Sequence, residues 1–184
     1  MDTLMNIIKG RRSVRKYEEK PVPDEHINQI LESIRWAPSW GNTQCWEVVV
    51  VKDPANRNKI RDIVSEKNPA RKAFTQAPVI FTLCAKLKVS GFYSGKSMTK
   101  LGDWFMFDMG LAAQNLCLAA HDLGLGTVIV GIFDHNRVKN IIGLGDDYEV
   151  VALVLLGYPA KDFPAPKRRD INDFAHYEVF KSKS

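Results

Sequence analysis

The segment from residue 103 to residue 123 reads DWFMFDMGLAAQNLCLAAHDL. Apolar residues recur in it every three or four positions, and this spacing predicts one long helix that Gly124 ends. One apolar stripe consists of Phe105, Met109, Ala112, Leu116, Ala119 and Leu123, whereas Trp104, Leu111 and Leu118 lie on other faces. A helix that is apolar on several sides is buried either centrally in a large core or by a partner subunit. Because the chain has only 184 residues, we expect a partner subunit to bury part of this helix, with Leu116 at the interface.

Further elements are predicted on both sides of this helix. Apolar runs predict buried strands at residues 46–52, 78–85, 127–132 and 149–156. Helical spacing of isoleucines after Pro23 predicts a helix that Pro38 stops. Asp53 and Pro54 form a helix start, and the helix is expected to reach about Lys67. A short helix is expected around Val138.

Length and composition favour one domain over residues 1–184, because 45% of the residues are hydrophobic and no linker divides the chain. No segment approaches the roughly 20 apolar residues of a membrane span. The first residues lack a secretion pattern, so we expect a cytoplasmic protein. The three cysteines are widely spaced, form no zinc or disulfide pattern, and fit a reducing compartment; no metal site is expected.

Two basic clusters stand far apart in the chain. Residues 11–15 contain three arginines and Ser13, and residues 167–169 read Lys-Arg-Arg. Guanidinium groups match phosphate oxygens, so the two clusters are candidates to bind one anion from opposite sides. The simpler interpretation of each is a solvated basic turn. A third group, Lys67, Arg71 and Lys72, is interpreted as a solvated helix surface, from which one member could reach a ligand.

The net charge of +5 also allows a nucleic-acid or polyanion binder. The basic surplus is concentrated in clusters rather than along one helix face, which favours a small phosphorylated ligand. Two short glycine motifs are set aside: Gly95-Lys96-Ser97 lacks the first glycine of a P-loop, and Gly124-Leu125-Gly126 lacks the third glycine of a dinucleotide fingerprint.

The loop at residues 38–44 contains small and hydrogen-bonding side chains between a buried helix and a buried strand. Such a loop is usually a plain connector. Held rigidly at the edge of the core, it could instead contact a planar heterocycle.

Taken in order, several of these segments resemble the nitroreductase family of FMN-dependent oxidoreductases. The resemblance covers roughly residues 6–169 and is carried by Arg11-Arg12-Ser13-Val14-Arg15, Ala37-Pro38-Ser39 with Asn42, Gln44 and Trp46, Gln114-Asn115-Leu116 through His121 to Thr127, and Leu156-Gly157-Tyr158-Pro159. It implies an α+β fold with a central, mostly antiparallel sheet flanked by helices. It also implies a homodimer that completes the domain and holds one FMN in each of two interface clefts.

The resemblance further implies which residues bind the cofactor. The phosphate and ribityl group would contact Arg11, Arg12, Ser13, Lys167 and Arg169, and the pyrimidine edge would contact Arg15. The loop that reaches the other subunit's FMN would supply Pro38, Ser39, Trp40 and Asn42. Val130 and Gly131 match the segment whose backbone amide lies near flavin N5.

The expected reaction is hydride transfer from NADH or NADPH to flavin N5, followed by reduction of a nitroaromatic, quinone or similar small molecule in a ping-pong cycle. Arg15 is the candidate for stabilising charge at flavin N1 and O2, and no side chain is an obligatory catalyst. Reductive dehalogenation and flavin breakdown are the alternatives within this fold, and polyanion binding without catalysis is a third possibility.

Two segments receive expectations from their position and their apolar content. The region from Lys86 to Gly102 is expected to cover the cleft, where Trp40, Phe92, Tyr93 and Trp104 could stack on an aromatic acceptor, although core packing is the simpler role for each. The tail from about residue 170 to residue 184 contains Ile171, Phe174 and Tyr177. We expect it to pack on a neighbouring subunit.

Overall fold

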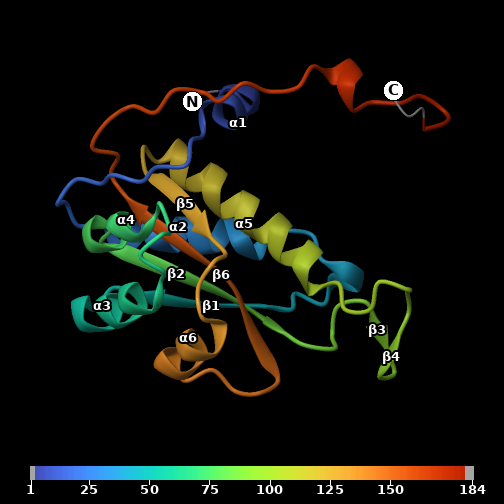
Figure 1. Cartoon of the computed structure of the whole chain (residues 1–184). Helices are drawn as coiled ribbons and strands as arrows, with labels where there is room; N and C mark the ends of the chain where they lie inside the picture. The colour runs from blue at the N-terminus through green and yellow to red at the C-terminus, as the bar shows by residue number, and fades with distance from the viewer. Residues whose placement is uncertain (1–2, 181–184) are drawn as a thin grey trace.

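The computed structural model describes residues 3–180, which form an α+β fold around one four-stranded sheet (Figure 1). The strands lie in the order β1 (Trp46–Val51), β2 (Val79–Lys86), β6 (Tyr148–Gly157) and β5 (Gly126–Val130), and all neighbours are antiparallel. The predicted central, mostly antiparallel sheet is therefore confirmed. The four expected strands are present, and their ends differ from the prediction by at most two residues.

Helices cover both faces of the sheet. α2 (Asp24–Arg35) and α5 (Phe105–Asp122) pack on one face, while α3 (Pro54–Ile63), α4 (Arg71–Gln76) and α6 (His135–Ile142) pack on the other. Along β2, Phe81 and Leu83 point into the first layer, whereas Ile80 and Cys84 point into the second. Because the two central strands are buried on both faces, their sequences are continuously apolar rather than alternating.

The end of α3 differs from the sequence prediction. Asp53 caps the helix as expected, since its side chain accepts a hydrogen bond of 2.9 Å from the backbone N–H of Asn56. The helix ends at Ile63 and not near Lys67, because Val64 adopts an extended conformation and is buried in the core. Pro69 further disfavours a helical conformation at the residue before it. The chain then forms a loop and starts α4 at Arg71.

Helix α5 buries its main apolar stripe inside its own chain, which corrects the expectation for Leu116. Leu116 is fully buried among α2 and the sheet, together with Met109 and Ala112. The outward face instead exposes Met106 and Phe107, at 61% and 59%. A partner subunit could therefore cover the outward face, but Leu116 does not serve an interface.

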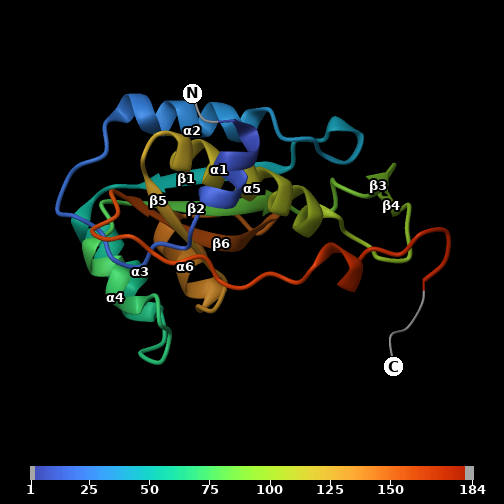
Figure 2. The ribbon, with the colours of Figure 1, turned by 90° about the horizontal axis from the view of Figure 1, so that it is seen from above.

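The remaining elements lie around this body. α1 (Leu4–Gly10) precedes the first basic cluster, and a small hairpin of β3 (Phe92–Tyr93) and β4 (Lys96–Ser97) precedes α5. After β6 the chain runs outside the body as an extended segment with one turn, η2 (Ile171–Asp173), as Figure 2 shows. The last four residues of the expected tail lie outside the described residues. None of the helices within residues 3–180 combines the length and apolar character needed to cross a membrane.

Candidate active site

The first basic cluster is held against the edge strand β5. The backbone N–H of Val14 donates to the carbonyl of Thr127 at 2.8 Å, and Ser13 forms a parallel bridge with Thr127. This approach requires glycine at position 126, since a Cβ there would lie 2.4 Å from a methyl carbon of Val14. The strand edge thereby fixes the backbone on which Arg11, Arg12 and Arg15 stand.

A cavity of about 230 Å³, the clamp pocket, opens beside this backbone. Helix α5 contributes His121 from its last turn, the segment after β6 contributes Lys161, and the pocket is lined by Gly10, Arg11, Arg12, Val14, His121, Leu125, Gly126, Thr127, Pro159, Lys161, Asp162 and Phe163. A Cβ at Gly10 would come within 2.5 Å of His121 Nε2. The imidazole of His121 can therefore occupy this position only because residue 10 is a glycine and has no side chain.

The two arginines in the clamp pocket retain unused donor capacity. Arg12 donates through Nη1 to the carbonyls of Lys9 and Arg11, but its buried Nε has no hydrogen-bond partner among residues 3–180. The Arg11 guanidinium forms no hydrogen bond or ion pair within the same residues. A buried donor without an acceptor costs about 1–3 kcal/mol. This donor set fits the phosphate of FMN, because phosphate oxygens accept several charged hydrogen bonds.

The second basic cluster lies outside the lining of the clamp pocket. Lys167 and Arg169 are exposed and do not line the clamp pocket, and Arg169 donates to the carbonyl of Asp173. Lys161, which the sequence analysis missed, supplies a cation to the pocket instead. It is an isolated lysine in the segment after β6, so no local pattern distinguishes it. The assignment of Lys167 and Arg169 to the phosphate stays a prediction.

Arg15 and the residues at the end of β5 lie further along the same edge. Arg15 is exposed, and its Nη1 lies 3.4 Å from the carbonyl of Ser13. Val130 is buried and Gly131 is exposed where β5 ends. Asn68 Nδ2 donates to the carbonyl of Ile132 at 3.2 Å, which ties the loop before α4 to this segment. Of the residues expected at the flavin ring, Arg15 and Gly131 are therefore accessible from outside the sheet edge, whereas the side chain of Val130 is buried.

The loop at residues 38–44 has a constrained backbone that its own side chains support. It contains the turn η1 (Trp40–Asn42), and Gly41, Asn42 and Gln44 have φ angles of 51°, 56° and 48°. Ser39 Oγ accepts a hydrogen bond of 2.9 Å from the backbone N–H of Gln44. Pro38 and Asn42 are exposed and face away from the core. This loop could present them to another molecule.

A buried carboxylate fixes this loop to helix α5. Asp108 is 1% exposed, and its Oδ1 accepts a hydrogen bond of 3.1 Å from the backbone N–H of Trp40. Its Oδ2 accepts a hydrogen bond of 2.6 Å from the Ser90 hydroxyl and lies 3.5 Å from the Cys45 thiol. Asp108 thus joins the loop, α5 and the region after β2. Asp108 was not considered in the sequence analysis. Its position as a carboxylate within a largely apolar helical segment was the signal that could have identified it.

Aromatic side chains gather next to Asp108. The rings of Trp40 and Trp104 lie 5.0 Å apart between centroids, and Phe107 lies 5.5 Å from Trp104. They line a cavity of about 390 Å³, the aromatic pocket, with Pro38, Ser39, Asp108 and Leu111. Of the expected substrate-stacking residues, Trp40 and Trp104 meet here. Phe92 and Tyr93 do not line this pocket, and Tyr93 is 74% exposed on the hairpin.

The cysteines do not form a thiolate site. All three are free and buried. Burial raises the pKa of Cys45 to about 12, with a further contribution from the neighbouring carboxylate of Asp108. Burial likewise raises the pKa of Cys84 to about 12. Both thiols are therefore protonated at neutral pH. Within residues 3–180 no group of three His, Cys, Asp or Glu side chains is arranged to bind a metal ion.

The expected cofactor residues form two groups at opposite ends of α5. The clamp pocket includes His121 near the end of the helix, whereas Trp40 bonds to Asp108 in its first turn. The helix has 18 residues and spans roughly 27 Å at 1.5 Å per residue. In one chain the clamp pocket and the 38–44 loop consequently face separate regions of space.

Comparison with known proteins places these features in a family. A model of the nitroreductase family matches residues 8–158. A protein of Methanothermobacter thermautotrophicus, provisionally named an NADH dehydrogenase/NAD(P)H nitroreductase, is 34% identical over 94% of this chain and 84% of its own length. The FMN reductase [NAD(P)H] of Bacillus subtilis is 30% identical over 92% of this chain and 70% of its own length.

A more divergent relative and a solved structure extend the comparison. Iodotyrosine deiodinase 1 of Rattus norvegicus is 27% identical over 90% of this chain and 66% of its own length. The crystal structure of a nitroreductase family protein from Clostridium novyi superimposes with a TM-score of 0.77 at 28% identity, covering 94% of this chain and 92% of that one.

We predict that replacing Asp108 with Asn loosens the loop at residues 38–44. The amide presents a donor where Ser90 or Trp40 now finds an acceptor, and a hydrogen bond to a charged group contributes about 1.5–3 kcal/mol. Urea denaturation should show a loss of unfolding free energy of this size. Asp122→Asn, an exposed change at the other end of α5, should leave the stability unchanged. Equal stability of the two variants would contradict the role of Asp108.

Proposed function

The chain belongs to the nitroreductase family and is an NAD(P)H-dependent oxidoreductase that uses FMN, and we propose that it reduces nitroaromatic, quinone or similar aromatic acceptors in a ping-pong cycle. The observation that carries the proposal is the clamp pocket, where a buried Arg12 Nε and an unpaired Arg11 guanidinium lack an anionic partner among the described residues. FMN supplies the redox chemistry when bound, because N5 accepts a hydride from a nicotinamide.

In this proposal the residues of the β5 edge bind and polarise the cofactor. Arg11, Arg12 and Ser13 hold the phosphate end, and Lys161 adds a cation from the segment after β6. Arg15 stabilises negative charge at N1 and O2, because a fixed cation costs no reorganisation during the reaction. The backbone of Val130 and Gly131 lies near N5. No side chain of this chain has to transfer a proton for hydride uptake.

We further propose a homodimer in which each cofactor site uses residues of both subunits. The two groups of expected FMN contacts lie at opposite ends of α5, so a second copy running in the opposite direction can bring its 38–44 loop to the first copy's clamp pocket. The outward face of α5 has the apolar character that such contact needs, since Phe107 and Met106 are exposed. The tail, with exposed Ile171, Tyr177 and Phe180, would cover the partner subunit.

The aromatic pocket supports an aromatic acceptor. The ring of Trp104 lies at stacking distance from the rings of Trp40 and Phe107. Pro38, Ser39 and Trp40 belong to the 38–44 loop, so the pocket is built partly from the loop that is proposed to reach the cofactor. Reductive dehalogenation is the second candidate reaction, because iodotyrosine deiodinase 1 is among the relatives. The cationic residues are divided between separate pockets, which favours small anions over a polymer such as nucleic acid. The three free cysteines agree with a cytoplasmic location.

The absorbance spectrum of the purified protein tests the proposed function. We expect a yellow flavin spectrum, which bleaches under nitrogen when NADH or NADPH is added and returns when a nitroaromatic, quinone or halogenated aromatic oxidises the enzyme. The acceptor that restores the colour fastest identifies the reaction class. A protein that remains colourless after incubation with FMN would contradict the proposal.

Arg11→Ala should weaken FMN binding, because it removes a charged hydrogen-bond donor from the phosphate. The loss should be about 1.5–3 kcal/mol, which is roughly 10- to 150-fold in the dissociation constant. Fluorescence titration of the apoprotein with FMN measures this change. Arg137→Ala on α6 removes the same charge outside the clamp pocket and is the matched control. Equal affinities of the two variants would show that Arg11 does not bind the phosphate.

Gly110→Arg should separate the dimer without damaging the fold. Gly110 is exposed on α5 between Phe107 and Gln114, and a Cβ there would meet no atom of its own chain within 4 Å. Arginine also favours a helix more than glycine does. Analytical ultracentrifugation should show monomers with reduced FMN content. Gly145→Arg, at an exposed glycine where a Cβ would meet only Tyr148 at 4.0 Å, is the control. An intact dimer in Gly110→Arg would refute this interface.

A further inference from the structure

A third pocket lies outside both the clamp pocket and the aromatic pocket. It has a volume of about 570 Å³ and lies between the end of α3, the loop after it and α4. We call it the basic pocket, and it is lined by Arg61, Asp62, Glu66, Lys67, Asn68, Pro69, Arg71, Lys72 and Thr75. Nothing in the proposed reaction uses these side chains. Its lining nevertheless carries more basic than acidic side chains.

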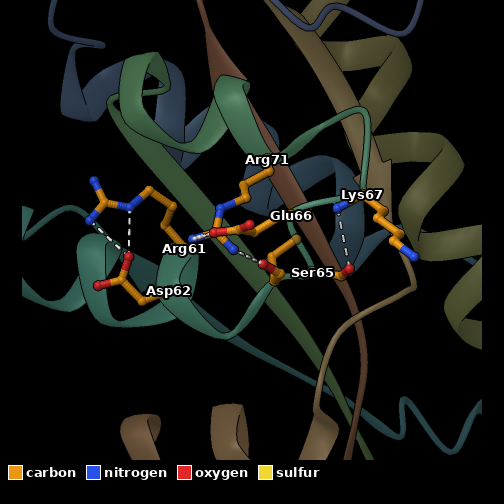
Figure 3. A network of polar contacts seen from close by, with 7 residues as sticks. Arg61, Asp62, Ser65, Glu66, Lys67 and Arg71 are labelled. Atoms are coloured by element: carbon orange, nitrogen blue, oxygen red, sulfur yellow. Dashed lines mark hydrogen bonds and ion pairs between the residues drawn. The ribbon is translucent and has the colours of Figure 1, made fainter.

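Four cationic and two acidic side chains line the basic pocket, an excess of two positive charges. Arg61 pairs with Asp62 at 2.8 Å, as Figure 3 shows. Glu66 is a weak partner for Arg71, because it lies 3.9 Å away and its side chain is 88% exposed. A surface pair of this kind contributes little and leaves Arg71 available to a stronger anion.

The excess positive charge resides mainly on two lysines. Neither Lys67 nor Lys72 forms a side-chain hydrogen bond or ion pair within residues 3–180, and in Figure 3 the ammonium of Lys67 extends away from both ion pairs. The guanidinium of Arg71 is held in position, since its Nη1 donates to the carbonyl of Val64. The pocket thus combines one positioned guanidinium with two ammonium groups that have no internal partner.

Two hydrogen bonds connect this pocket to the proposed flavin site. Asn68, on its rim, donates to the carbonyl of Ile132, next to Gly131. At the other end of α4, Gln76 Oε1 accepts a hydrogen bond of 3.2 Å from the backbone N–H of Tyr17, two residues after Arg15. The loop and helix that form the pocket are therefore fixed to both segments expected at the flavin ring.

We propose that the basic pocket binds the 2′-phosphomonoester of NADPH and so gives the enzyme a preference for NADPH over NADH. The proposal rests on the proposed function, because hydride transfer requires the nicotinamide ring at the flavin and leaves the adenosine half to reach outward. A phosphomonoester carries close to two negative charges at neutral pH, which matches the excess in the pocket. Arginine near the adenosine ribose is a general means of accepting this phosphate.

Calorimetric titration of the FMN-loaded protein with two nucleotide probes tests the assignment. Adenosine 2′,5′-bisphosphate should bind more tightly than adenosine 5′-monophosphate, and its affinity should fall as salt is raised. Lys67→Glu and Lys72→Glu should each weaken binding of the bisphosphate by at least about tenfold, because each removes one charged contact and places a like charge beside the phosphate. The KM for NADPH should rise by a similar factor, with the KM for NADH unchanged.

Lys59→Glu is the matched control, because it makes the same charge change on α3 outside the basic pocket. It should leave bisphosphate affinity and both KM values unchanged. Equal binding of the two nucleotides, or equal effects of all three variants, would overturn the proposal. So would inorganic phosphate binding as tightly as the bisphosphate, since that would indicate an anion site without nucleotide recognition.

Failure of the NADPH assignment can be distinguished from failure of the proposed FMN-dependent function. If Lys67→Glu and Lys72→Glu lower FMN affinity instead, the pocket belongs to the flavin, and the co-substrate assignment fails while the flavin assignment stands. If the protein proves to bind no FMN, the proposed function fails. The bisphosphate titration of the colourless protein then still reports whether the basic pocket recognises the 2′-phosphate.

Discussion

A rigid helix holds the two halves of the candidate site apart. Helix α5 is buried along one side by α2 and the sheet, so its length and direction are fixed by the core. Its first turn contains Asp108, which accepts a hydrogen bond from Trp40 in the 38–44 loop. Its last turn contains His121, which lines the clamp pocket. Because a helix of this length cannot bend its ends together, one chain cannot close both groups around one ligand. This constraint is the main support for the proposed dimer.

Polar groups in this protein fall into two classes that serve different purposes. Asp108 is buried with its acceptors occupied by Trp40 and Ser90, which makes it a structural joint between segments. In the clamp pocket, by contrast, the buried Nε of Arg12 has no hydrogen-bond partner among the described residues, and the lysine side chains of the basic pocket form no hydrogen bond or ion pair there. Unused donors next to a cavity indicate a ligand that is itself anionic, and the two pockets could receive different phosphates.

The sequence predicted the elements with strong local periodicity. The runs at residues 78–85 and 149–156 are apolar throughout, and they form the two central strands because helices cover both faces. The predictions based on one pattern alone were weaker. The end of α3 was placed too late because burial of Val64 interrupts the helix, and Leu116 was assigned to an interface because an apolar stripe does not say which body covers it.

The sequence by itself determined which residue types and which local spacings are present: the arginine cluster at residues 11–15, the capped helices, the buried strands and the family resemblance. The tertiary structure alone decided which distant residues meet. It brings Trp40, Ser90 and Asp108 together, places Lys161 rather than Lys167 beside Arg11, and gathers Lys67, Arg71 and Lys72 around one cavity. The physical reason is that periodicity reports how each residue faces its own element, whereas contacts between elements depend on packing that no local pattern encodes.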